Sequence, residues 1–390
     1  MKRTADVVII GGGCMGASTA FHLARRGITN VLLIERESML GAGSTGRNAG
    51  GVRHQFSSEA NVLLSIESIR VLENFEEEVG FKIDFQRDGY LFLLSNEDDL
   101  AVFRRNVEMQ RALGIDVAVL TPGEAARLAP GLGMDGIVGA TFCARDGIAD
   151  PNGVTLGFAK AAQKSGVEIW RGTEATAIRV DRGRVVGVET DRGTVSTRVV
   201  VNAAGPFARE IGLMAGLKIP VLPYRRHIFI SEQLPASKDD SFPASKIMVI
   251  DFATTFYFHR EGGAVLFGMS DPEEPSSYNL SVSWEFLEQV TEAAARRLPA
   301  LADLGIAHAW AGLYEMTPDA MPIIGEASHP GGFFMINGFS GHGFQHSPAT
   351  GRLVAEWLLD GRPSMDLSVF DPARFASGAV APLDRGPDPE

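Results

Sequence analysis

The first 35 residues alternate between two short apolar runs and one helical stripe. The runs Val7–Ile10 and Val31–Ile34 are continuous and apolar, which is typical of strands. Between them, apolar residues from Ala17 to Ala24 recur at positions i, i+3, i+4 and i+7, the period of one helix face. The pattern therefore predicts a strand, a helix and a second strand, and Glu35 follows the second strand.

The rest of the chain continues to alternate between helical and strand patterns. Asp88-Gly89 is a hairpin-type dipeptide and predicts a strand pair over 85–94. Thr121-Pro122-Gly123-Glu124 has the capping-box arrangement of a helix start. We expect helices over 58–79, 98–113, 151–165, 283–297 and 344–359, and strands over 167–170, 175–180, 185–190, 195–201 and 333–337, with a strand-rich aromatic block from 221 to 270.

Three glycines separate the first strand from its helix in the spacing G-x-G-x-x-G. Gly11 permits a tight turn, Gly13 lets a pyrophosphate approach the backbone, and Gly16 lets helix and strand pack closely. The amides of the first helical turn would face the phosphates. A carboxylate at Glu35 suits a ribose 2′-OH and disfavours a 2′-phosphate. The segment therefore predicts binding of a dinucleotide other than NADP.

Two further stretches are rich in small residues. The loop over 41–51 would be costly to order without a purpose, because its glycines lose much backbone entropy. The turn Gly338–Gly343 precedes a helix, so its amides can meet an anion or a polar cofactor edge. A tight turn without a ligand is the alternative for 338–343.

Composition narrows the class of protein. The 390 residues are 45% hydrophobic and 22% charged, as in globular proteins, with a formal net charge of −12 and no basic run, so nucleic acid is not an expected partner. The only cysteines, Cys14 and Cys143, show no metal-type spacing, so we expect no metal site and a reducing, cytoplasmic compartment. Apolar runs are too short for a membrane span or a signal peptide.

Taken together, these segments resemble the flavin-dependent D-amino-acid-oxidase superfamily. The resemblance is carried by 7–16, Glu35-Arg36, 43–53, 202–206, 317–325 and 338–343, which lie in the family's order. The branch that the chain resembles most contains the sarcosine oxidase β-subunit and dimethylglycine dehydrogenase.

The resemblance implies an α/β fold with antiparallel sheets in two domains. A Rossmann-like FAD-binding domain would comprise 1–84, 145–220 and 314–372. A mostly antiparallel substrate domain would comprise 85–144 and 221–313, and 373–390 would form a loose tail. FAD would lie extended, with its isoalloxazine between the 43–51 and 338–344 loops and the substrate on one flavin face.

Most of the candidate cofactor residues cluster in the glycine-rich segments. They are Gly11, Gly13, Cys14, Met15, Gly16, Glu35, Arg36, Gly43, Ser44, Thr45, Arg47, Asn48, Ala49, Gly50, Ala175, Ala203, Ala204, Gly205, Gly312, Gly341, His342, Gly343, Phe344 and Gln345.

Four residues are candidates for the substrate site on the same resemblance. Arg53 matches an arginine that binds the substrate carboxylate, a task suited to its planar fork. Gln345 stands where many family oxidases have a lysine, so it keeps a donor and loses the charge. Tyr257 matches a tyrosine facing the flavin, and His342 lies in the second glycine turn. An ion pair, a helix-start polar group or core packing are the structural alternatives.

Two departures from the family's simple oxidases refine the expected activity. Gly312 stands near the cysteine that attaches FAD in those enzymes, so we expect noncovalent FAD. Leu266 falls near their oxygen-activating lysine and cannot stabilise developing superoxide charge, which favours a dehydrogenase.

The sequence thus predicts FAD-dependent oxidation of a sarcosine-, dimethylglycine- or proline-like amine or amino acid. Hydride transfer to flavin N5 would give an imine that hydrolyses. An α-type partner subunit or an electron-acceptor protein is a possible partner. The alternatives are a flavin-binding assembly or scaffold protein that lost turnover, and a nicotinamide enzyme, which the second glycine turn disfavours.

Overall fold

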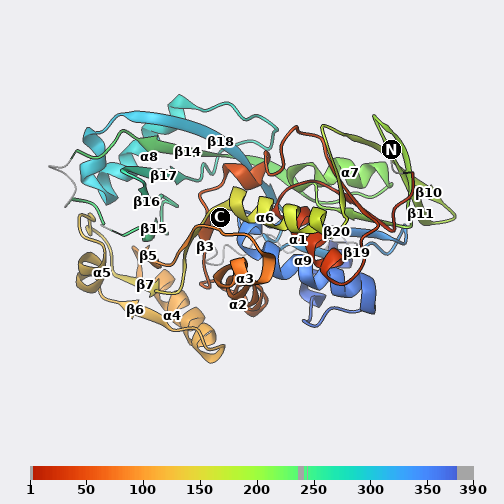
Figure 1. The fold of residues 1–390 in the computed structure, drawn as a ribbon. Coiled ribbons are helices and arrows are strands. Elements are labelled where there is room, and N and C mark those ends of the chain that lie inside the picture. The colour runs from red at the N-terminus through yellow and green to blue at the C-terminus, as the bar shows by residue number, and fades with distance from the viewer. Residues whose placement is uncertain (1–2, 236–240, 244, 376–390) are drawn as a thin grey trace.

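Two large β-sheets organise the chain, as the computed structural model shows for residues 3–235, 241–243 and 245–375 (Figure 1). One sheet has six strands and the other has eight. The six-stranded sheet has the order β19 (Ile323–Glu326), β20 (Phe333–Asn337), β13 (Val199–Asn202), β1 (Val7–Ile10), β2 (Val31–Glu35) and β9 (Glu168–Arg171).

Strand β1 lies at the centre of the six-stranded sheet because its four residues are apolar on both faces. It pairs in parallel with β13 and with β2, and all four of its residues are buried. Three helices, α1 (Cys14–Arg25), α6 (Pro151–Lys164) and α9 (Gly343–Asp360), share the hydrophobic core on one face. The other face carries β10 (Ala175–Asp181), β11 (Arg184–Thr190), β12 (Gly193–Ser196) and α7 (Ala208–Met214). This arrangement confirms the Rossmann-like part of the expected fold class.

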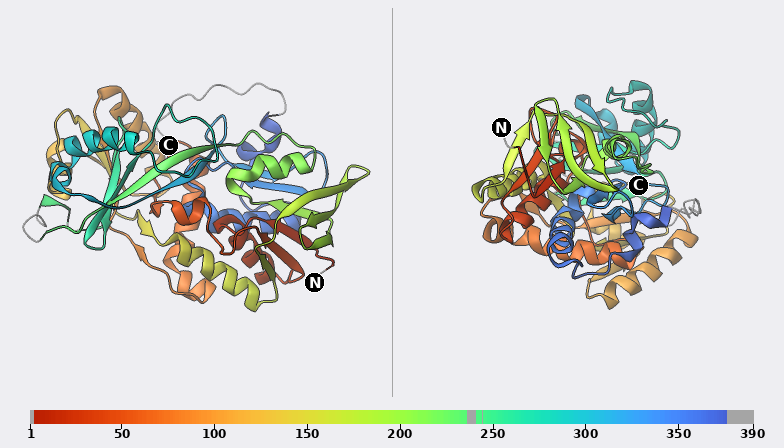
Figure 2. Two further views of the ribbon diagram at one scale, coloured as in Figure 1. Left: turned by 90° about the horizontal axis from the view of Figure 1, so that it is seen from above. Right: turned by 90° about the vertical axis from the view of Figure 1, so that its right-hand side faces the viewer.

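The eight-stranded sheet lies at the other end of the molecule (Figure 2). Most of its pairs are antiparallel, and the pair between β15 and β5 is parallel. Helices α5 (Pro122–Leu128) and α8 (Trp284–Arg297) pack in a core on one face, and α4 (Glu97–Ala112) packs beside the other. The strands are, in order, β18 (Ile306–Met316), β14 (Leu222–Ser231), β17 (Ala264–Met269), β16 (Tyr257–Glu261), β15 (Met248–Asp251), β5 (Tyr90–Leu94), β7 (Gly139–Cys143) and β6 (Val117–Leu120).

Short elements connect the two sheets. A small antiparallel sheet joins β3 (Gly51–Val52), β8 (Gly147–Ala149) and β4 (Phe85–Gln86). The remaining elements are α2 (Glu59–Glu73), α3 (Phe75–Val79) and the 3-10 helices η1 (Ser44–Arg47), η2 (Gly205–Phe207), η4 (Pro299–Asp303), η5 (Ser368–Phe370) and η6 (Pro372–Phe375).

The expected hairpin around Asp88-Gly89 is wrong. Strand β4 pairs with β8, whereas β5 pairs with β7 and β15, so the two strands belong to different sheets. Gly89 donates its N–H to the Asp146 carbonyl at 2.9 Å, and this long-range bond turns the chain from one sheet into the other. Tertiary pairing overrides the local turn signal here.

Two other expectations need correction. The helix expected over 58–79 is divided at Asn74 into α2 and α3, where the Asn74 side chain donates to the Arg70 carbonyl at 2.8 Å. Residues 373–375, expected as the start of a loose tail, belong instead to η6, and Arg374 pairs with Asp319 at 2.8 Å. Residues 376–390 lie outside the described part of the chain. The capping box at Thr121 and Glu124 is confirmed.

The two sheets draw on the stretches of sequence assigned to two domains. The six-stranded sheet uses strands from 1–84, 145–220 and 314–372, and the eight-stranded sheet uses 85–144 and 221–316. The exact domain boundaries stay a prediction. Across the described ranges, none of the helices combines the length and apolar character of a membrane span.

Candidate functional site: a cavity between the two sheets

A cavity of about 870 Å³ joins the two sheets. Its walls include the carboxyl end of β1 on one side and Ile228 and Tyr257 of the eight-stranded sheet on the other. Both glycine turns line it. The turns are more than 300 residues apart in sequence, so only the fold brings them together.

The first glycine turn is compatible only with glycine at two of its positions. Gly11 has φ +113°, and a Cβ there would lie 2.2 Å from the Ala203 carbonyl oxygen. A Cβ on Gly16 would lie 2.0 Å from the Gly11 carbonyl oxygen. The turn can therefore hold helix α1 close to β1 with its amino end open to the cavity, the arrangement that accepts a pyrophosphate.

Glu35 is held at the end of β2 by two backbone amides. Its carboxylate accepts from the N–H of Gly12 at 2.7 Å and of Glu37 at 2.8 Å, and burial raises its pKa. The guanidinium of the next residue, Arg36, stacks over the Phe207 ring at 3.7 Å. Both residues line the cavity and form its nucleotide end.

The small-residue loop docks onto β18. Arg47 donates to the carbonyls of Ala311 at 3.0 Å and Ala42 at 3.2 Å, and Ser44 donates to the Leu313 carbonyl at 2.6 Å. A Cβ on Gly312 would lie 3.0 Å from the Arg47 Cβ, so this glycine permits the close approach. The loop is thereby ordered as a wall of the cavity.

Cys14 begins α1 beside this loop. Burial raises the pKa of its thiol to about 11, so the group is a neutral thiol at ordinary pH. Its backbone N–H donates to the Thr45 hydroxyl at 3.2 Å.

The second glycine turn packs against Tyr314 and Glu315. A Cβ on Gly341 would lie 2.4 Å from the Tyr314 ring. The Phe339 N–H donates to the Glu315 carboxyl at 3.5 Å, and burial raises the pKa of Glu315 to about 7. The cavity therefore contains an acid that is partly protonated near neutral pH.

Both the backbone and the side chain of Arg53 are held in place. Its backbone N–H donates to the Gln345 side-chain oxygen at 2.8 Å. Its guanidinium donates to the Gln55 backbone carbonyl at 3.1 Å and lies 4.2 Å from the Phe56 ring centre. The residue is 7% exposed and lines the cavity. A guanidinium held in this way is preorganised to bind a carboxylate.

Gln345 and His342 follow the second glycine turn. The Gln345 side-chain nitrogen lies 3.2 Å from the His346 ring, and its oxygen is used by Arg53. Burial is the main reason that the pKa of His342 falls to about 3, and the nearby Arg53 charge adds to it. His342 is therefore a neutral imidazole, 5.2 Å from the Phe56 ring.

Three tyrosines, one buried and two half-buried, line the ring end of the cavity, where the two loops meet. They are Tyr90, Tyr257 and Tyr314. Burial raises the pKa of Tyr257 well above its usual value, and the same holds for Tyr90, so both are neutral phenols.

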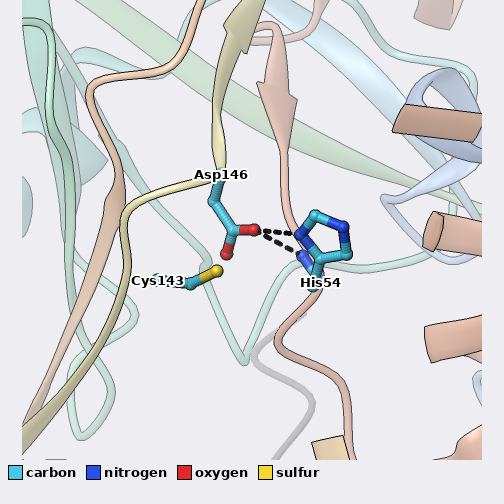
Figure 3. A group of neighbouring side chains, drawn as sticks. All are labelled: His54, Cys143 and Asp146. Atoms are coloured by element: carbon cyan, nitrogen blue, oxygen red, sulfur yellow. Dashed lines mark hydrogen bonds and ion pairs between the residues drawn. The ribbon is translucent and has the colours of Figure 1, made fainter. Parts of the chain in front are cut away.

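A cluster behind Arg53 was missed by the sequence reasoning (Figure 3). The Asp146 carboxylate accepts from the His54 N–H at 2.9 Å, lies 2.6 Å from His54 Nδ1, and accepts from Gln55 at 3.2 Å. With Cys143, the group offers three possible metal-ligand atoms within 4.8 Å of one another. The residues come from β7, the turn after it and the segment after β3, so no local spacing signals them. The absence of a metal site stays a prediction.

Nearly all predicted site residues line the cavity, including Arg53, Tyr257, His342 and Gln345. Gly16 and Gly50 instead make close backbone contacts behind it, to the carbonyls of Gly11 and Ala149. Their ligand roles stay predictions. The sequence reasoning missed lining residues such as Arg226, Tyr90 and Glu315; a signal for Arg226 was available in the Arg225-Arg226 pair at the start of an apolar strand.

The cavity fits an extended dinucleotide that ends in a flat ring system. The turn at Gly11–Gly16 places the amino end of α1 beside the cavity, and a Cβ added at Gly13 would meet only the Thr45 hydroxyl, at 3.1 Å. The second glycine turn and the 41–51 loop provide the far walls. The fold and the cavity define a dinucleotide-binding protein.

The chain belongs to the DAO family of FAD-dependent oxidoreductases, whose family model matches residues 6–357. It is 33% identical to the mitochondrial sarcosine dehydrogenase of Homo sapiens, over 96% of this chain and 42% of that protein, and 30% identical to the mitochondrial dimethylglycine dehydrogenase of Rattus norvegicus, over 96% and 45%. This chain therefore spans less than half the length of those relatives. A crystal structure of L-proline dehydrogenase from P. horikoshii is similar with a TM-score of 0.90 and 34% identity, over 98% of this chain and 100% of that one. The expected family, branch, fold class and FAD cofactor are confirmed.

Proposed function

We propose that the chain oxidises a secondary or tertiary amine, or an amino acid, at the carbon next to nitrogen, with a substrate like sarcosine, dimethylglycine or proline. The observation that carries this proposal is the position of Arg53, a fixed guanidinium that lines the same cavity as both glycine turns. The names of the relatives support this substrate class.

The bound FAD supplies the acceptor for two electrons. In the substrate, the C–H bond next to nitrogen breaks, the nitrogen lone pair forms a C=N bond, and water then converts the imine to a carbonyl compound and an amine. Arg53 would bind the carboxylate and so orient the substrate in the cavity. The nearby guanidinium charge disfavours an ammonium and so favours the neutral amine, the form that can lose hydride.

The test is anaerobic bleaching of the 450 nm absorbance by a panel of N-methyl and cyclic amino acids. Bleaching by at least one secondary amine, with formation of the carbonyl product, supports the proposal. Flavin that stays oxidised with every member of the panel contradicts it and favours the scaffold alternative.

We also propose that FAD is held noncovalently and that the electrons pass to an acceptor other than oxygen, in line with Gly312 and the buried Leu266. Acid precipitation should leave the yellow colour in the supernatant. The reduced protein should reoxidise much faster with an electron-accepting dye than with air. An acceptor protein or a partner subunit would then complete the reaction in the cell.

A further inference from the structure

The ring end of the cavity is lined by a second arginine besides Arg53. Arg226 lies on β14 of the eight-stranded sheet, is 9% exposed and lines the same cavity. Arg53 follows β3 of the small connecting sheet. The two arginines thus come from different parts of the fold and line one cavity.

The alternation of β14 directs Arg226 towards the cavity and its neighbour away from it. Arg225 forms a two-point pair with Glu274, at 3.1 and 2.9 Å, and donates to the Ser281 carbonyl at 2.7 Å. Arg226 lies 5.2 Å from the Tyr314 ring centre and donates to the Arg225 carbonyl at 3.1 Å. Stacking on an aromatic face and a backbone acceptor hold the guanidinium in place.

Five glutamate side chains line the cavity, and one of them lies at its ring end. Four of them, Glu35, Glu37, Glu174 and Glu210, gather at the nucleotide end with Arg36 and Phe207. The fifth, Glu315, contacts the second glycine turn and is partly protonated near neutral pH. The ring end therefore carries a surplus of positive charge, which favours an anionic occupant.

We propose that this pocket selects secondary amino acids that carry a second carboxylate, with Arg53 binding one carboxylate and Arg226 the other. The inference rests on the proposed amine oxidation and narrows its substrate class. The reacting C–H bond and the electron acceptor are unchanged. A charge-assisted pair at the second carboxylate should raise affinity about 10- to 100-fold over a substrate that lacks it.

Two matched pairs of probes test the proposal. Sarcosine and iminodiacetate share the N-substituted glycine unit, and only iminodiacetate has the second carboxylate. Butyrate and glutarate are unreactive analogues that report binding through the flavin spectrum. We expect the wild-type protein to bind the dicarboxylate of each pair at least about 10-fold more tightly.

Arg226→Met should remove this preference by weakening the binding of iminodiacetate and glutarate far more than that of sarcosine and butyrate. Arg226→Lys should keep part of the preference, because it keeps the charge. Arg179→Met removes one exposed positive charge on β10 and should behave as wild type.

Three outcomes would overturn the proposal: no preference in the wild type, an equal loss for both probes in Arg226→Met, or a change only in FAD affinity. The comparison of mono- and dicarboxylates on the wild-type protein tests the proposal even if a variant fails to fold. If glutarate is preferred while no amine bleaches the flavin, the two-cation pocket is supported and the amine oxidation is what fails.

Discussion

The Asp146 carboxylate bridges the backbone N–H and the ring of His54, at 2.9 and 2.6 Å (Figure 3). The same carboxylate accepts from Gln55, whose carbonyl receives the Arg53 guanidinium. A fully buried acid thus fixes the segment that presents Arg53 to the cavity.

We expect Asp146→Asn to loosen this segment. Loss of a buried charged acceptor should lower the free energy of unfolding by about 1–3 kcal/mol and raise the KM for carboxylated substrates more than it lowers kcat. Thermal unfolding and steady-state kinetics measure the two effects. The control Thr141→Val removes a neutral bond to Gln55 and should have the smaller effect on KM. An unchanged KM in Asp146→Asn would show that the anchor does not act on Arg53.

Arg53 itself should decide the binding of the substrate carboxylate. Arg53→Ala should raise the KM for acidic amines about 10- to 100-fold, because a charge-assisted pair is lost, and should change kcat less. Arg53→Lys keeps the charge without the planar fork, so its KM should lie between those of the wild type and Arg53→Ala. If Arg53→Ala keeps the wild-type KM for every amine that it oxidises, Arg53 does not bind the substrate carboxylate.

Two glycines beside helix α1 allow the effect of a steric clash to be separated from that of backbone strain. Gly11→Ala combines a φ of +113° with a contact of 2.2 Å to the Ala203 carbonyl oxygen, whereas Gly27→Ala has a φ of +91° and nothing within 4 Å. The Gly27 variant should lose about 1–2 kcal/mol of stability from backbone conformation alone. The Gly11 variant should lose more and bind FAD far more weakly, as measured by chemical unfolding and by FAD fluorescence. Equal effects in both variants would argue against the close approach.

Glu315 should make the stability of the apoprotein depend on pH. Its pKa is about 7 in the fold and 4.5 when unfolded, so the folded state favours the protonated acid. Protonated Glu315 therefore contributes fully to the free energy of unfolding below pH 4.5. This contribution falls as the pH rises and is lost above about pH 7. The total change is at most about 3 kcal/mol.

Glu315→Gln should remove this part of the pH profile, since the amide does not titrate. The depressed pKa of His342 acts in the opposite direction between about pH 3 and 6.5, and this effect is common to both proteins. Chemical unfolding of the two apoproteins from pH 4 to 9 measures the difference. A difference that does not change with pH would exclude the raised pKa.

The sequence by itself determined the local elements of the nucleotide end. The run Val7–Ile10, the glycine spacing and the stripe of α1 are neighbours in sequence, so their periodicity and turn chemistry specify β1, the turn and the helix. The position of Glu35 at the end of β2 could be predicted for the same reason, because it directly follows the apolar run Val31–Ile34. The cytoplasmic location stays a prediction that rests on the cysteine count.

The tertiary structure alone decided what faces the ring end of the cavity. Asp88-Gly89 joins two sheets instead of closing a hairpin, because Gly89 bonds to the distant Asp146. The Asp146 anchor, and the choice of which face of β14 meets the cavity, depend on contacts between residues far apart in the chain. Such pairings follow from the burial of whole sheet faces, and no local pattern of residues encodes them.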